Sequence, residues 1–249
     1  MIKHLLALAV AIAAFGAVAK ADDTKPTIRA VADEWPPFSG AALPGRGLSL
    51  DVISAVFARA GYVVESDVLP WARIMDGARR SAFDVVGSLF LDEELKAFLE
   101  YSDPFYATDV RFVQRTGGTH VFTSVEDLRP YSFAVGDGFL YEDEFDRADY
   151  LNKVTVTTTL QAMQMVAFGR VDLTLDSVDV VNYAMRALDT SLADQLEFVP
   201  GTLTSQNIHM AMRKDFPNRD AVLADFNAAL AEMRADGTLD AILQRHVGE

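Results

Sequence analysis

The fold is decided by residues 105–115, FYATDVRFVQR, a long strand-like segment that leads into Thr116-Gly117-Gly118-Thr119. The glycine pair predicts a flexible connection at this point. A second long strand-like segment occupies residues 207–214. Two extended segments so far apart in the chain predict two crossings between two separately packed parts of the molecule.

Segments with strand and helix patterns alternate on both sides of residues 105–115. In residues 48–60, for example, apolar side chains recur on one helical face until Gly61 ends the pattern. Such alternation is typical of parallel βαβ units. The predicted strands are residues 27–32, 62–69, 83–89, 131–136, 153–158 and 171–176, and the predicted helices are residues 48–60, 71–80, 141–150, 159–169, 178–188, 219–235 and a short helix from Gly237 to Val247.

These segments predict the α/β fold class, in two lobes that are connected by a two-strand hinge. Residues 22–112 together with residues 212–249 are expected to form lobe 1, with the C-terminal helices packed back on it. Residues 113–211 are expected to form lobe 2. A single continuous doubly wound sheet is the alternative, because periodicity does not separate the two arrangements.

Residues 1–21 have the pattern of a cleaved secretory signal peptide. Lys3 and His4 form a short basic start, residues 5–19 are small and apolar, and Ala19-Lys20-Ala21 supplies the cleavage pattern. A membrane anchor is the alternative, but a bilayer-spanning helix takes ~20 apolar residues. The sequence therefore predicts export, with the bacterial periplasm as the destination.

The chain is acidic and contains no cysteine. Its formal net charge of −14 argues against nucleic acid as a partner, because phosphate binding depends on clustered Lys and Arg. The four histidines, His4, His120, His209 and His246, show no metal-ligand spacing. No Gly-x-Ser-x-Gly, Walker or dinucleotide-binding motif is present. We expect no metal, no cofactor, no catalytic residue and no enzyme activity.

A series of short motifs extends in order over residues 27–247. The motifs are residues 34–38 (EWPPF), 47–52 (GLSLDV), 70–73 (PWAR), 83–87 (FDVVG), 101–106 (YSDPFY), 124–128 (SVEDL), 169–172 (GRVD) and 235–239 (ADGTL). Together they resemble the family 3 solute-binding proteins, the periplasmic receptors of ABC transporters for polar amino acids. Residues 70–73 and 138–141 (GFLY) are most similar to the branch of that family whose ligands are unassigned.

The resemblance implies a periplasmic binding protein of the type II clamp class. A small polar solute, an amino acid or a related compound, would lie between the lobes, and closure would bury it. The closed form would then dock on the membrane permease of an ABC importer, and we expect the receptor to be a monomer. A cyclohexadienyl dehydratase-like enzyme on the same fold and a stand-alone sensor module are the alternatives; turnover of prephenate would identify the first.

Aromatic residues are the first candidates for the walls of the ligand site. The resemblance places Trp35 and Trp71 at ligand-stacking positions, and an indole face stabilises a cationic group by ~0.5–2 kcal/mol. A place in the core is the alternative for either tryptophan. Phe38, Phe90 and Tyr141 are the other aromatic candidates.

Polar anchoring is expected from three further residues. Arg73 is the candidate for a ligand carboxylate, because a guanidinium group binds carboxylates bidentately, although an exposed surface cation is the alternative. The resemblance places Ser88 and Phe90, at the end of a predicted strand, where hydroxyl or backbone groups contact ligand. Gly138 precedes a predicted helix, where backbone N–H groups bind anions, although a simple turn is the alternative.

The sequence departs from the family pattern at both head-group anchors. The family's carboxylate-binding arginine falls on Leu95, and its ammonium-binding aspartate falls on Ser177, one residue after Asp176. Because a one-residue shift in a strand reverses the face, Asp176 and Ser177 are alternatives for this role. The acidic residues 92–94 are expected to cap a short helix, since negative charge complements a helix N-terminus.

Overall fold

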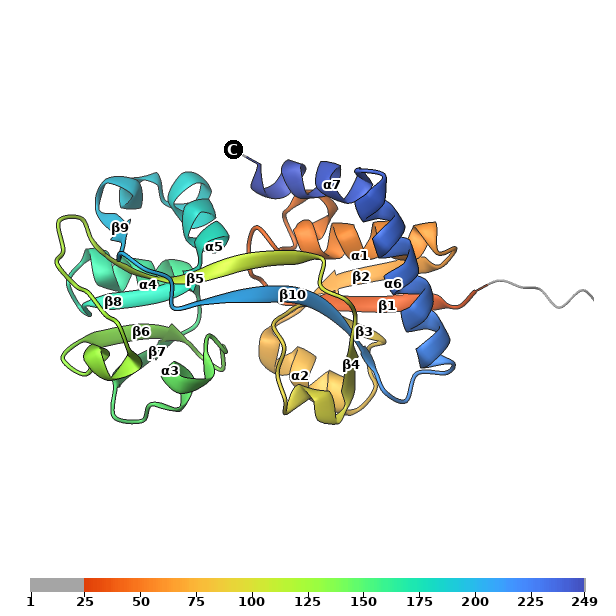
Figure 1. Cartoon of the computed structure of the whole chain (residues 1–249), viewed down its shortest axis with the longest axis horizontal. Coiled ribbons are helices and arrows are strands. Elements are labelled where there is room, and N and C mark those ends of the chain that lie inside the picture. Colours follow the sequence, from red (N-terminus) through yellow and green to blue (C-terminus); the bar gives the residue numbers. More distant parts are fainter. Residues whose placement is uncertain (1–24, 249) are drawn as a thin grey trace, which may run out of the picture.

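The computed structural model describes residues 25–248, and the predicted signal peptide lies outside them. Two lobes lie side by side and are joined by β5 (Tyr106–Arg115) and β10 (Thr204–Arg213) (Figure 1). The predicted α/β clamp with its two-strand hinge is therefore confirmed. The residues at which the lobes were divided stay a prediction. Between residues 25 and 248, none of the helices is long and apolar enough to cross a membrane.

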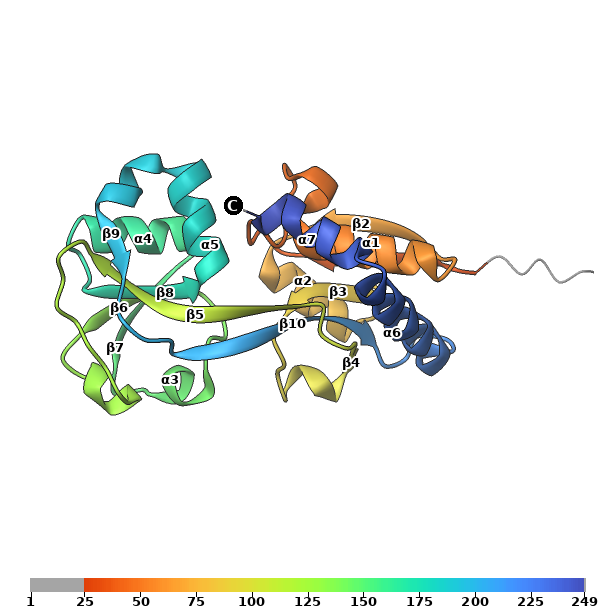
Figure 2. The ribbon, with the colours of Figure 1, turned by 45° about the horizontal axis from the view of Figure 1, so that its top comes forward.

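Lobe 1 is built on a sheet in which β1 lies between β2 and β3, parallel to both. Its strands and helices are β1 (Thr27–Ala32), β2 (Val63–Val68), β3 (Val85–Leu89), β4 (Leu99–Tyr101), α1 (Leu48–Arg59), α2 (Trp71–Arg79), α6 (Arg219–Ala235) and α7 (Thr238–Val247). Alternate residues of β1 face opposite sides: Ile28 and Ala30 join the core under α1 and α6, whereas Val31 joins the core under α2. The helices accordingly cover both faces (Figure 2).

Lobe 2 repeats this layered arrangement around β6, which lies parallel to both β7 and β8. Its elements are β6 (Ser132–Gly136), β7 (Asn152–Val156), β8 (Leu173–Ser177), β9 (Leu196–Phe198), α3 (Asp143–Arg147), α4 (Thr159–Ala167) and α5 (Val178–Tyr183). Phe112, Phe133 and Phe145 fill the core on the α3 side, and Met163 and Val166 of α4 contribute to the core on the other face.

The two sheets share β10, which changes partner along its length. Residues 204–208 of β10 pair with β5, and residues 209–212 pair with β3. Strand pairing is therefore unbroken from β2 to β7. Each lobe has a core of its own, and Val180 of α5 packs with the core of lobe 1. The two sheets are thus hydrogen-bonded to each other through β5 and β10, the two strands that connect the lobes.

Two helices differ from the sequence prediction. The helix expected over residues 141–150 is confined to Asp143–Arg147, because the Glu142 side chain caps its start and Lys153 binds the carbonyl oxygens of Phe145 and Asp146 at its end. The helix expected over residues 178–188 is α5 followed by a π-helical turn, Ala184–Leu188.

Asp84 connects three parts of lobe 1. Its buried carboxylate, at the start of β3, accepts hydrogen bonds from Arg29 on β1 and from Arg213 at the end of β10, the latter over 3.1 Å. Burial by itself would raise the pKa of Asp84, but the hydrogen bonds from the two arginines outweigh it and hold the pKa below its usual value.

Replacing Asp84 by asparagine is expected to lower the free energy of unfolding by about 2–3 kcal/mol, because Arg29 loses its described counter-charge and Arg213 keeps only the exposed Asp215. Urea denaturation at pH 7 measures this loss. Since the folded-state pKa is depressed, the contribution exists above the unfolded pKa and disappears as the pH falls through the folded value. Asp215→Asn is the matched control: Asp215 is an exposed partner of Arg213 and should change stability by less than about 1 kcal/mol.

Candidate functional site

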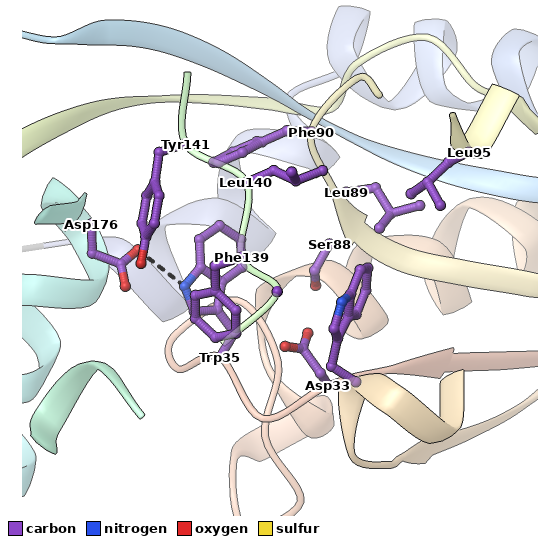
Figure 3. A pocket seen from close by; sticks show the side chains of 12 residues that line it. Asp33, Trp35, Ser88, Leu89, Phe90, Leu95, Phe139, Leu140, Tyr141 and Asp176 are labelled. Atoms are coloured by element: carbon purple, nitrogen blue, oxygen red, sulfur yellow. Dashed lines mark hydrogen bonds between the residues drawn. The ribbon is translucent and has the colours of Figure 1, made fainter. Parts of the chain in front are cut away.

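A pocket lies between the two lobes beside the hinge strands (Figure 3). Its volume, with the open mouth included, is about 570 Å³. Most of the side chains around it are aromatic or aliphatic. The lining residues are Asp33, Trp35, Trp71, Ser88, Leu89, Phe90 and Leu95 from lobe 1 and Gly138, Phe139, Leu140, Tyr141 and Asp176 from lobe 2.

The structure brings most of the sequence candidates together in this pocket. They are Trp35, Trp71, Ser88, Phe90, Gly138, Tyr141 and Asp176. Leu95, where the resemblance located the family's arginine, is also part of the wall. These residues are contributed by strand ends and loops of both lobes, as expected for an open α/β sheet. Their role in ligand binding stays a prediction.

Three sequence candidates do not line the pocket. Phe38 is completely buried beneath the indole of Trp35, with 4.6 Å between the ring centroids. Ser177 is completely buried as the N-cap of α5 and accepts a hydrogen bond from the backbone N–H of Asp179. Arg73 is exposed on α2, because two residues along a helix turn the side chain about 200° away from Trp71.

Trp35 belongs to the core and to the pocket at once. The loop after β1 folds back so that the backbone N–H of Trp35 donates to the carbonyl of Ser39 over 2.9 Å. Phe38 below and the edge of Phe90, 5.4 Å away between centroids, hold the indole in place. Its Nε1 donates a hydrogen bond to Oδ1 of Asp176 over 3.2 Å, so the lobes touch directly across the pocket (Figure 3).

Asp176 occupies the penultimate position of β8 and is buried. Its carboxylate accepts hydrogen bonds from the hydroxyl of Thr159, the backbone N–H of Ser177 and the indole of Trp35. Burial raises the pKa of Asp176 to about 6, and these hydrogen bonds oppose that rise. All three donors are neutral, so the charge of Asp176 has no described counter-charge.

Asp33 is a pocket residue that the sequence analysis missed. It is the first residue after β1, and its carboxylate points into the pocket (Figure 3). Burial, with a smaller contribution from the charges of Asp176 and Glu34, raises the pKa of Asp33 to about 6. Its position past the carboxyl end of a parallel strand was the available signal.

Among the described residues, the carboxylate of Asp33 forms no ion pair and no hydrogen bond with another residue. No Lys, Arg or His belongs to the described lining of the pocket. No group of three or more potential metal ligands occurs among residues 25–248. Two acidic side chains thus share a largely apolar pocket with no described cation.

A β-bulge in β3 positions Ser88 in the wall of the pocket. His209 of β10 pairs with Leu89 and Ala211 pairs with Val86, so β3 contains one extra residue between these pairs. Ser88 there adopts a left-handed backbone with φ 60°, a conformation that non-glycine residues rarely take and that often marks functional sites. The bulge lets three consecutive residues, 88–90, reach the pocket.

The loop from Gly138 to Tyr141 closes the pocket from lobe 2. Gly138 has φ 71°, and a Cβ at this position would lie 3.7 Å from the indole of Trp71, so a glycine suits both the backbone and the close approach. The hydroxyl of Tyr141 accepts a hydrogen bond from the backbone N–H of Gly136 over 2.8 Å and thereby anchors the loop. Phe139 contacts the cores of both lobes.

Comparison with known proteins gives the family. A model of the bacterial extracellular solute-binding proteins, family 3, matches residues 28–249. The chain belongs to this family. The resemblance inferred from the sequence motifs is therefore confirmed. Proteins of this family are extracellular solute-binding proteins of bacteria.

This family 3 solute-binding protein is similar to the L-cystine-binding protein TcyA of Bacillus subtilis (strain 168). The two are 29% identical over 205 residues, which are 82% of this chain and 73% of TcyA. A solved ancestral arginine-binding protein bound to arginine matches with a TM-score of 0.75 and 24% identity, over 90% of this chain and 100% of that chain. A histidine kinase sensor domain matches with a TM-score of 0.76 and 21% identity, over 91% and 98%.

Proposed function

We propose that this family 3 solute-binding protein captures a small solute between its lobes and delivers it to an ABC importer. The observation that carries the proposal is the pocket whose lining comes from both lobes, closed by the hydrogen bond between Trp35 and Asp176. A ligand that contacts both lobes stabilises this arrangement over one in which the lobes are apart. The family and the names of curated relatives support a role in binding.

The proposed site consists of the sequence candidates that line the pocket, with Asp33 added. Trp35, Trp71, Phe90 and Tyr141 supply its walls, and Asp176 supplies a charge. Ser88 and the backbone of Gly138 supply further contacts. Arg73, Phe38 and Ser177 have no part in this proposal, because none of them lines the pocket.

The proposed location is the periplasm, reached through cleavage of the signal peptide, and the proposed partner is the membrane permease of the importer. The extracellular character of the family supports this location. The structural similarity to a histidine kinase sensor domain is a similarity of fold, at 21% identity. We propose that the protein acts as a monomeric carrier.

The pocket also supports a binding role over the dehydratase alternative. An enzyme acting on a substrate with carboxylates needs a cation to hold them, and the described lining contains only acids as charged groups. The relative TcyA is named as a binding protein. We therefore propose that the protein is not an enzyme.

A thermal-shift screen of the mature protein against amino acids, amines, organic acids and osmolytes tests the proposal. A solute at 100 times its dissociation constant adds ~2.7 kcal/mol to the folded state. For a protein of this size that corresponds to a rise of roughly 5–10 °C in melting temperature. A chain that no solute stabilises would contradict a receptor function.

A further inference from the structure

The charges of the pocket have one sign. Asp176 accepts hydrogen bonds only from neutral groups, and Asp33 has no partner residue in the described part of the chain. A carboxylate in an apolar site is costly unless a cation or several hydrogen bonds accompany it. The wall of the pocket therefore contains two acids and no described positive charge.

Neighbouring groups do not supply a positive charge to the pocket. Glu34, beside Asp33, is another acid and is exposed. Tyr141 is buried and carries no positive charge, and its hydroxyl accepts a hydrogen bond from the backbone N–H of Gly136. Arg111 lies opposite Asp176 in the β5–β8 pair, but its guanidinium donates to the carbonyl oxygens of Gly201 and Val199. Lys96, beside Leu95, is paired with Glu93, and Arg73 is exposed on another side of α2.

The remaining walls suit a cation with an apolar body. The indoles of Trp35 and Trp71 and the rings of Phe90, Phe139 and Tyr141 surround the acids, and aromatic faces attract ammonium and guanidinium groups. Leu89, Leu95 and Leu140 offer contacts only to apolar atoms. A carboxylate on the ligand would meet two acids and no described cation.

Resting on the proposed receptor function, we infer that the ligand is a small organic cation without a carboxylate. Its amine, guanidine or quaternary ammonium group lies against Asp33 and Asp176, and its aliphatic or aromatic body lies against the rings. The inference stands on the composition of the pocket. The raised pKa values of the two acids agree with it, because burial disfavours both charges and a bound cation would offset that cost.

Matched pairs of compounds test this inference by isothermal titration calorimetry at pH 7.5. Each pair consists of an amino acid and the amine that lacks its carboxylate: phenylalanine and phenethylamine, arginine and agmatine, lysine and cadaverine. For at least one pair we expect the amine to bind 10-fold or more tightly than the amino acid. The corresponding amino-acid amides, similar in size but without the negative charge, should recover most of that affinity.

The outcomes separate this inference from the receptor function. If amino acids or anions bind and the amines do not, the inference is wrong and the receptor function stands. If no compound of any charge binds, the receptor function is wrong as well, and the inference falls with it. Equal binding of amine and amino acid in every pair also overturns the inference.

A variant pair then tests the role of the acids. Asp33→Asn should weaken binding of the preferred amine by 10-fold or more and should reduce its advantage over the amino acid. Glu34→Gln changes the same charge on the adjacent, exposed residue and should alter affinity less than 3-fold. At pH 6, titrations in two buffers of different ionisation enthalpy should reveal proton release on binding, because a bound cation favours the ionised acids. Equal losses in the two variants would overturn the assignment.

Discussion

Replacement of Asp176 by asparagine is expected to stabilise the ligand-free protein at pH 7 and to weaken cation binding at least 30-fold. The stabilisation follows because the variant no longer buries a carboxylate that lacks a counter-charge. The loss of affinity follows because a buried charge on the ligand loses its partner, which costs about 2–5 kcal/mol. Thermal unfolding and calorimetric titration of the same samples measure both effects.

The pH dependence of the stability difference between Asp176→Asn and the wild type distinguishes loss of a buried charge from a change in side-chain packing. Burial raises the pKa of Asp176 from 3.8 to about 6 in the folded state, so the folded state binds more protons than the unfolded state between these values. The cost of Asp176 is therefore fully present above pH 6 and disappears as the pH falls toward 4. The melting temperature of Asp176→Asn should exceed that of the wild type at pH 7.5 and approach it near pH 4.

Asp143→Asn is the matched control for Asp176→Asn. It makes the same change of charge on an exposed residue of lobe 2 that is paired with Arg147. Both stability and affinity should change little, since exposed ion pairs contribute less than about 1 kcal/mol. A destabilised Asp176→Asn protein would contradict the cost of burying this carboxylate, and unchanged affinity would show that the carboxylate is not the charged contact of the ligand.

Replacement of Trp71 by alanine is expected to weaken binding by roughly 10- to 100-fold and to change the melting temperature by only a few degrees. Trp71 is the first residue of α2, partly exposed, and its indole forms a wall of the pocket opposite Gly138. The affinity loss corresponds to about 1.5–3 kcal/mol, the sum expected from lost aromatic area and cation–π contact. Calorimetry and thermal unfolding again give both quantities.

Arg73→Ala is the control for Trp71→Ala, because it truncates a long side chain on the same helix two residues away. Its affinity should equal that of the wild type within about 2-fold, since the exposed guanidinium does not line the pocket. If Arg73→Ala abolished binding and Trp71→Ala did not, the ligand would contact the other side of α2 and the proposed site would be wrong.

Local sequence patterns were sufficient for most of the fold. The helix over residues 219–235 and the strand over residues 27–32 have the predicted bounds, because each has a period of its own and clear end signals. The boundaries that moved, as in residues 141–150, depend on contacts from elsewhere: Lys153 of β7 binds the carbonyls that end α3.

The choice between Asp176 and Ser177 shows where sequence patterns fail. Both residues end β8, and their side chains face opposite sides of the sheet. The family pattern left Asp176 and Ser177 as alternatives; in the structure Ser177 caps α5, and Asp176 meets Trp35 from the other lobe. Which face borders the pocket depends on how β8 pairs with β5 and β6.

Patterns in the sequence were enough to predict the two α/β blocks, the two strands that connect them, the family and the aromatic lining of the pocket. These features depend on periodicity, turn residues and motif order, which can be read from short stretches of sequence. Three features became visible in the folded chain alone: Asp33 and Asp176 share one pocket, Arg73 faces solvent, and Phe38 packs against Trp35. Asp33 and Asp176 are far apart in the chain, and the packing of one lobe against the other brings them to one pocket, whereas the places of Arg73 and Phe38 depend on packing within lobe 1.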